Sequence, residues 1–113
     1  MNVNELTLGQ IKEIHQLLGS SGADTFRPYE LGEDYLIRTV THINIGTVIA
    51  VGPNEIVLMN ASWVADTGRY HNALVEGTLS EVEPYPDGQE VIVGRGAVVD
   101  ATRWLHPLPR EQK

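Results

Sequence analysis

The sequence predicts an α+β protein that is mainly β: a small twisted antiparallel sheet or open barrel, with an N-terminal helix and one short inserted helix. The 113 residues are enough for one domain with a modest core. From residue 33 onward, short segments rich in branched and aromatic residues alternate with turn-forming residues, as strands and their connections do. Two other segments have features of helices instead.

The N-terminal helix is expected within residues 1–19. Thr7 and Gln10 have the spacing of a capping box, and Gly19 is a natural stop. The apolar residues between them fall on one helical face: Ile11, Ile14, Leu17 and Leu18. Residues 20–33 are rich in turn formers and lack periodicity, so they are expected to form a linker.

The β-rich domain is expected over residues 34–105. Its predicted strands are residues 35–43, 46–51, 55–60, 81–83, 90–93 and 97–104. A helix over residues 69–76, ended by Gly77, is inserted between the third and fourth strands, and residues 94–96 are expected to form a bulge or tight turn. Pro107 and Pro109 end regular structure, which leaves a polar tail over residues 106–113. Because so small a sheet has open edges, we expect the chain to form a homo-oligomer.

Composition excludes several classes of function. The formal net charge of −7 argues against a long nucleic-acid partner, since such a partner needs a basic face. The absence of cysteine excludes disulfides and thiolate metal sites. No apolar run has the length of a membrane helix and the N-terminus does not resemble a signal peptide, so we expect no membrane partner and a cytoplasmic location.

Arginine supplies most of the positive charge, and its planar fork suits a phosphate or carboxylate better than lysine does. Arg38 and Arg103 are both expected within strands, beside apolar residues, where a guanidinium must be paired or meet a ligand. The alternative is that these arginines pair with the fifteen Asp and Glu residues of the chain.

The segment from Asn60 to Gly77 is the richest in polar chemistry. It is expected to leave a strand through small residues and to run as a loop into the inserted helix, carrying Trp63 and then Asp66, Thr67, Gly68 and Arg69. An aromatic plane, a carboxylate, a hydroxyl and a guanidinium near a helix start suit a small polar ligand, above all a phosphorylated one. The alternative is a surface loop in which Asp66 or Thr67 caps the helix.

Residues 64–68 and 92–95 resemble the two signature segments of retroviral-type aspartic proteases. The spacing does not fit, because only 27 residues separate Asp66 from Val93, too few for the intervening hairpin. Arg69 also stands where that family has a small residue. The four histidines are scattered, and no nucleophile arrangement is visible, so we expect neither catalysis nor a metal or other cofactor.

An ordered set of segments resembles a known family. Residues 37–39 (Ile-Arg-Thr), Gly46, the pair Asn60-Ala61 before a Trp-bearing loop, and residues 73–77 are similar to small phage-encoded proteins that disarm the Thoeris antiviral system. The similarity covers residues 35–104. It implies a non-enzymatic sponge that sequesters cyclic ADP-ribose isomers, the signals made by immune TIR-domain enzymes, and in some members cyclic oligonucleotides. It also implies a homo-oligomer with nucleotide pockets near the contacts between protomers.

The resemblance assigns residues to the expected site. Arg38 and Thr39 match the strand pair of the family, the segment from Asn60 to Arg69 matches its loop and helix, and Arg103 is an added phosphate partner by position. The candidate ligand-binding set is therefore Arg38, Thr39, Asn60, Trp63, Asp66, Thr67, Gly68, Arg69 and Arg103. The chain departs from the family in having a less aromatic loop and an extra N-terminal helix. The alternative function is a β-rich oligomeric structural or protein-interaction module of a phage or larger complex.

Overall fold

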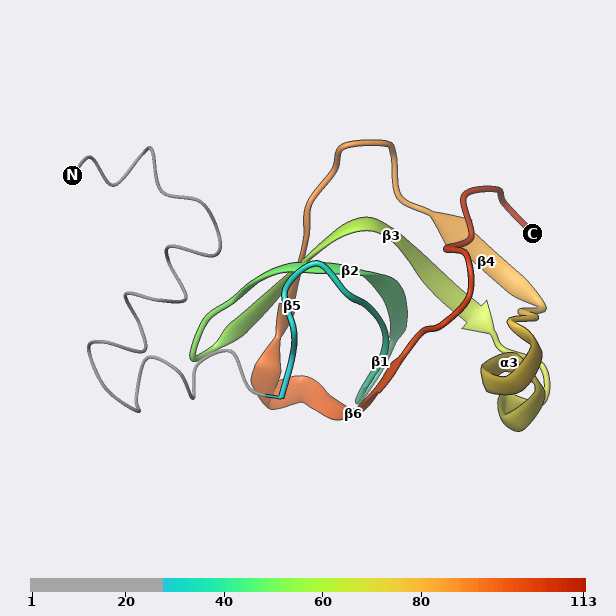
Figure 1. Cartoon of the computed structure of the whole chain (residues 1–113), viewed down its shortest axis with the longest axis horizontal. Coiled ribbons are helices and arrows are strands. Elements are labelled where there is room, and N and C mark those ends of the chain that lie inside the picture. The colour runs from blue at the N-terminus through green and yellow to red at the C-terminus, as the bar shows by residue number, and fades with distance from the viewer. Residues whose placement is uncertain (1–27) are drawn as a thin grey trace.

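The computed structural model describes residues 28–113, and the predicted N-terminal helix lies outside these residues. The described chain forms a curled antiparallel sheet with one α-helix and one short 3-10 helix (Figure 1). The strands are β1 (Asp34–Thr39), β2 (Ile43–Val51), β3 (Glu55–Asp66), β4 (Glu81–Pro84), β5 (Val91–Gly94) and β6 (Val98–Arg103). The helices are α3 (Tyr70–Glu76) between β3 and β4, and η2 (Arg95–Ala97) between β5 and β6. The predicted mainly β fold with one inserted helix is confirmed.

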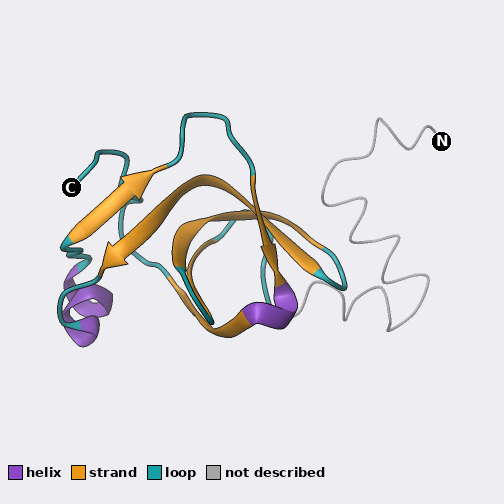
Figure 2. Ribbon diagram, turned by 180° about the vertical axis from the view of Figure 1, so that it is seen from behind, coloured by secondary structure: helices purple, strands orange, loops and turns teal. Residues whose placement is uncertain are grey.

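The sheet has the strand order β4-β3-β2-β1-β6, and β5 also pairs with β3. Strand β3 is long enough to hold two partners along one edge: β5 beside residues 55–58 and β4 beside residues 62–66. Because β5 continues through η2 into β6, the chain passes from one edge of the sheet to the other without closing it (Figure 2). The result is an open barrel.

Two apolar clusters hold the sheet, one on each face. The inner core lies inside the curl and draws on every strand except β4: Tyr35, Ile37, Val48, Val51, Ile56, Leu58, Ala61 and Val93, with Tyr29, Leu31, Val98 and Ala101. The outer core lies between the other face, α3 and the chain after β6: Leu36, Ile45, Val64, Ala73, Leu79, Val82 and Trp104. Alternation along β1 explains the division, since Leu36 and Ile37 point to opposite faces.

Strand β3 contains a bulge that the sequence did not reveal. Asn60 and Ala61 together oppose Gly46 of β2, and Asn60 has a φ of 52°. A Cβ on Gly46 would stand 3.0 Å from the Cα of Ala61, so glycine permits the close approach of the two strands. The expectation of a loop after Asn60 is wrong, because the bulge bends β3 and the strand continues to Asp66.

The predicted strand over residues 35–43 is also wrong in one respect, because the chain reverses within it. β1 ends at Thr39, whose hydroxyl donates to the carbonyl of His42 and accepts from its N–H, both at 2.9 Å. A threonine hydroxyl that bonds nearby backbone groups stabilises a tight turn. Residues 40–42 thus connect β1 to β2.

The chain after β6 packs against the outer face of the sheet. Lys113 and Val82 exchange two backbone hydrogen bonds of 2.9 and 3.0 Å, so the last residues lie alongside β4 (Figure 1). The Trp104 indole donates to the carbonyl of Pro107, and the Ser62 hydroxyl donates to that of Pro109. Within residues 28–113 no helix has the length and apolar character needed to cross a membrane.

Candidate functional site: a cleft beside Trp63

Trp63 lies on the inner face of the sheet, in register with Asn44 and Ile37, and 40% of it is exposed. It pairs with Asn44 of β2 on one side and with Glu83 of β4 on the other. The indole borders a cleft of about 320 Å³, which we call the Trp63 cleft, lined by His42, Trp63, Glu83, Pro84, Tyr85 and Pro86. Exposed aromatic surface in a concave site is suited to stacking on a flat ligand.

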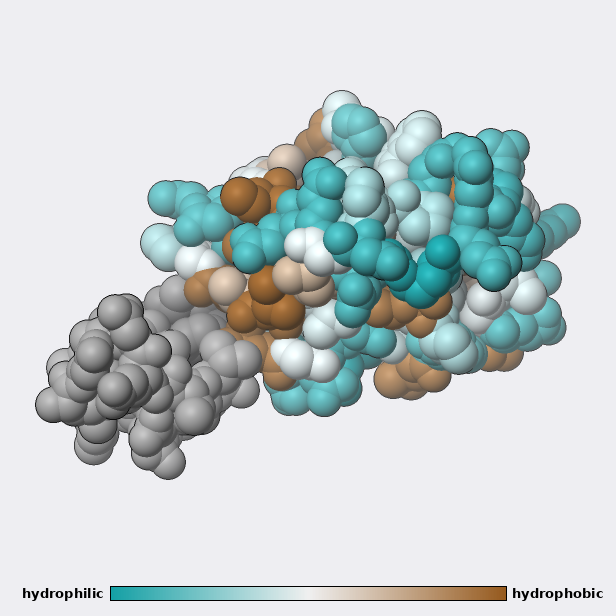
Figure 3. Space-filling view, turned by 90° about the horizontal axis from the view of Figure 1, so that it is seen from above, coloured by the Kyte–Doolittle hydropathy of each residue, from teal (hydrophilic) through white to brown (hydrophobic). Residues whose placement is uncertain are grey.

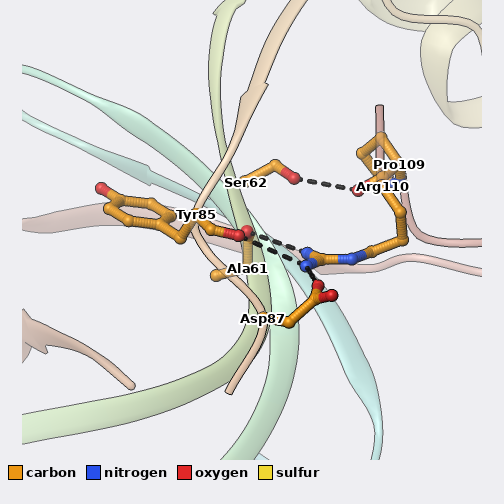
Figure 4. A network of polar contacts seen from close by, with 6 residues as sticks. All are labelled: Ala61, Ser62, Tyr85, Asp87, Pro109 and Arg110. Carbon is orange, nitrogen blue, oxygen red and sulfur yellow. Dashed lines mark hydrogen bonds and ion pairs between the residues drawn. The ribbon is translucent and has the colours of Figure 1, made fainter. Parts of the chain in front are cut away.

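One wall of the Trp63 cleft is fixed by Arg110, a residue that the sequence placed in the polar tail. Its guanidinium donates to the carbonyls of Ala61 and Tyr85, each at 3.3 Å, and to the Asp87 carboxylate at 2.5 Å (Figure 4). The backbone N–H of Tyr85 also donates to the carbonyl of Ala61 at 2.9 Å. These bonds hold the segment after β4 against β3 and set the width of the cleft.

His42 forms the opposite wall. Its ring lies 6.3 Å from that of Trp63, centre to centre, and the planes are inclined by 60°. Its Nδ1 is 2.7 Å from the hydroxyl of Thr41, while its backbone is held by Thr39. Thr39, a predicted ligand residue, therefore positions the turn that carries His42.

Asn44 is an unusual residue beside this cleft. Only 7% of its surface is exposed, and its Oδ1 is enclosed without a hydrogen-bond partner within residues 28–113. Most buried polar atoms in folded proteins are paired, because an unpaired one loses its bond to water without compensation. Sequence reasoning missed Asn44, although an amide between Ile43 and Ile45 on an alternating strand was a usable signal.

Arg38 is bound to a carboxylate, and its partly exposed side chain lines a surface hollow beside Thr39. Its Nε donates to Asp100 Oδ1 at 2.7 Å and its Nη2 donates to Oδ2, while the guanidinium stacks 4.5 Å above the Tyr70 ring. The hydrogen bonds from Arg38 lower the pKa of Asp100, and the same bonds raise the pKa of Arg38. The pairing of strand arginines with acids, the alternative considered from sequence, describes Arg38.

Arg103 is engaged in the same way on the other face of the sheet. It donates to Glu33 at 2.9 Å, lies 3.8 Å from Glu30, and has its guanidinium 5.7 Å from the Tyr35 ring centre. Tyr35 is on the inner face, whereas Arg38 contacts Tyr70 over the outer face. Arg38 and Arg103 therefore do not converge on one ligand.

The segment from Asp66 to Arg69 forms a turn before α3. The Asp66 carboxylate accepts from the N–H of Gly68 at 2.8 Å, and Gly68 has a φ of 70°. The prediction that Asp66 or Thr67 caps the helix is wrong: Arg69 occupies the capping position without a side-chain bond, and Thr67 donates to the carbonyl of Gly68. The Asp66 carboxylate does not cap the helix because it accepts a hydrogen bond from the N–H of Gly68, two residues later in the turn.

Arg69 differs from the other predicted arginines because it forms no ion pair within residues 28–113. It lines a second cleft of about 360 Å³, which we call the Arg69 cleft, with Thr67, Gly68, Asn72, Thr78, Leu79, Ser80 and Lys113. Two cations among hydroxyl and amide groups form a polar surface that suits an anionic group. From Trp63 to the end of β3 at Asp66 the strand advances about 10 Å, so the two clefts are separated along the strand.

The predicted residues thus fall into separate groups. Trp63 and Thr39 belong to or support the Trp63 cleft, and Thr67, Gly68 and Arg69 line the Arg69 cleft. Asn60 is exposed at the bulge, while Arg38 and Arg103 are bound to carboxylates.

The part of the chain that the structure describes contains no cluster of three or more His, Asp or Glu residues able to hold a metal ion. Comparison of the chain with models of protein families, with curated proteins and with solved structures finds no match.

Proposed function

We propose that the protein is a non-enzymatic sponge that binds cyclic nucleotide signals and releases them chemically intact. The proposed ligands are cyclic ADP-ribose isomers, with cyclic oligonucleotides as a further class. The proposed setting is a phage protein that acts against host defence, in the host cytoplasm, as a homo-oligomer. The sequence resemblance over residues 35–104 supplies the ligand class.

The observation that carries the proposal is the exposed indole of Trp63 beside His42 and Tyr85 in a cleft of about 320 Å³. Aromatic planes bind a nucleobase by stacking, which contributes about 1–3 kcal/mol per base. Arg69 and Lys113 offer cations for phosphate in the Arg69 cleft. A sponge needs affinity without turnover, and these two clefts offer stacking and charge.

The test is a thermal-shift screen of the full chain against cyclic ADP-ribose isomers, cyclic di- and trinucleotides, and linear ADP-ribose. A tight ligand at saturation stabilises the protein by several kcal/mol, which gives a clear shift. The bound ligand is then released by heat and identified by mass spectrometry. A large shift with intact ligand supports the proposal, whereas cleavage of the ligand, or no shift with any nucleotide, overturns it.

Fluorescence locates the site. The chain has two tryptophans, of which Trp104 is buried in the outer core. In a Trp104→Phe variant, emission comes from Trp63 alone, and a base stacked on its indole is expected to quench it. An unchanged spectrum with a ligand that shifts the melting temperature would place the site elsewhere.

A second candidate function is a protein-interaction module. Val40 and Val99 are 75% and 65% exposed and line one surface hollow near the free edge of β6, and apolar patches stand among polar atoms in Figure 3. Open strand edges with exposed apolar side chains favour association. Val40→Asp would abolish assembly under this function, and no nucleotide would shift the melting temperature.

A further inference from the structure

Asn44 occupies a defined place in the row of side chains that crosses the inner face. Its register partners are Ile37 in β1 and Trp63 in β3. His42 precedes it by two residues, at the entry to β2. The amide therefore stands next to both rings that border the Trp63 cleft.

The Asn44 amide also lacks what buried amides normally have. Its Oδ1 is enclosed by protein and has no hydrogen-bond partner within residues 28–113. The neighbouring residues at this level of the inner face, Ile37 and Ala101, are apolar, so packing alone would favour an apolar side chain here. An unpaired buried oxygen next to an exposed indole points to a partner that residues 28–113 do not supply.

We propose that Asn44 reads the edge of an adenine ring that stacks on Trp63. Asn44 lies behind the residues that line the cleft, so this role requires rotation about its two side-chain torsions to bring the amide to the cleft. In that orientation Oδ1 would accept from the adenine 6-amino group and Nδ2 would donate to N7. An asparagine amide forms this pair of bonds with adenine because its donor and acceptor match the spacing on that edge. The inference rests on the proposed function in one respect, namely that the Trp63 cleft takes the base.

The Oδ1 and Nδ2 atoms of Asn44 would also distinguish adenine from related rings. Hypoxanthine and guanine carry an oxygen at position 6, which meets Oδ1 as a second acceptor. A 7-deaza-adenine has no acceptor for Nδ2. Stacking on Trp63 is nearly the same for all of these rings, so the preference among them reports on the amide.

The experiment measures the binding of adenosine, inosine and 7-deaza-adenosine 5′-monophosphates to the full chain by calorimetry. Wild type is expected to bind the adenosine form about tenfold more tightly than the other two. Asn44→Leu, which keeps the branching and removes the polar atoms, is expected to bind all three alike. Asn54→Leu, at the exposed β2–β3 turn, is the matched control and is expected to keep the preference. If Asn44→Leu does not fold, Asn44→Ala replaces it.

In the monophosphate series, the assignment is overturned by no preference for the adenosine form in wild type or by the same preference in Asn44→Leu. A parallel titration with cyclic ADP-ribose separates this inference from the proposed function. Cyclic ADP-ribose bound equally by wild type and Asn44→Leu keeps the sponge and overturns the role of Asn44. An adenine preference that Asn44→Leu abolishes, with no cyclic nucleotide bound, keeps the role of Asn44 and overturns the sponge.

Discussion

Arg38 and Asp100 lie directly opposite each other in β1 and β6 and share two hydrogen bonds, although 62 residues separate them in the sequence. The guanidinium is clamped on its other side by the Tyr70 ring of α3. One side chain thus connects the sheet edge to the inserted helix.

This pairing predicts a dependence of stability on pH. Because Arg38 lowers the pKa of Asp100 in the folded protein, the pair stabilises the fold above the ordinary carboxyl value of about 3.9. That contribution is lost as the pH falls through the lower folded value. Asp100→Asn should therefore show a shallower fall in melting temperature between pH 5 and pH 2 than wild type, with only a small change at pH 7 because both side chains are partly exposed. Glu111→Gln, at an exposed position, should follow wild type, and parallel curves for Asp100→Asn would contradict the prediction.

Gly46→Ala should destabilise the fold by about 1–3 kcal/mol, because the new methyl group would lie 3.0 Å from the Ala61 Cα and 3.2 Å from the Met59 carbonyl oxygen. The measurement is the free energy of unfolding from urea titration. Gly94→Ala is the control, since a Cβ there meets nothing within 4 Å and the backbone is extended. Equal losses in the two variants would show that the bulge does not require glycine.

Asn44→Leu should raise the free energy of unfolding by about 1–2 kcal/mol in the absence of ligand. The reason is that the variant removes an enclosed oxygen that has no partner within residues 28–113. Chemical denaturation of wild type and variant checks this. A loss of stability would mean that the amide is paired in solution.

Arg110→Met should loosen the wall of the Trp63 cleft. The guanidinium holds two carbonyls and a carboxylate, so its loss should cost about 1–3 kcal/mol of stability and speed hydrogen exchange at the Tyr85 amide. Glu111→Met, on the adjacent exposed residue, should change neither quantity. An unchanged exchange rate at the Tyr85 amide in Arg110→Met would show that the backbone hydrogen bond from Tyr85 to Ala61 holds this wall without the guanidinium.

Arg69→Gln should weaken binding of the cyclic nucleotide by about 1.5–3 kcal/mol, the usual value for a hydrogen bond to a charged group. Arg103→Gln should change the affinity little, because Arg103 is already bound to Glu33 on the inner face. Calorimetry with a cyclic ADP-ribose isomer compares them. A larger loss of affinity in Arg103→Gln than in Arg69→Gln would indicate that the phosphate binds to Arg103.

The fold class followed from local patterns, because alternation and turn residues are encoded over a few positions. The limits of the strands did not. Thr39 reverses the chain inside a run of β-forming residues, and Asn60 stays within a strand although its neighbours are small and polar. In each case the local structure depends on a contact with another residue. The turn depends on the carbonyl of His42, and the bulge depends on the absence of a side chain at Gly46.

The candidate site was predicted in part. Trp63 and Arg69 were singled out because a tryptophan in a polar segment and an arginine before a predicted helix are conspicuous in the sequence, and each lines a cleft. Arg38 and Arg103 pointed to phosphate, but a guanidinium fits a carboxylate equally well, and the sequence does not show which acid arrives beside it. Arg110 joined the site only through contacts with Tyr85 and Ala61, which lie 25 and 49 residues earlier in the chain.

The pairing of β1 with β6 also bears on how the chain reaches its fold. The β2–β3 hairpin joins neighbouring segments, whereas the seam between β1 and β6 must close a loop of about sixty residues, which costs more chain entropy. We therefore expect the hairpin to form early and the seam late. The barrel would then be complete only when β6, which follows η2, pairs with β1. Formation of the Arg38–Asp100 contact would therefore mark the last step of folding.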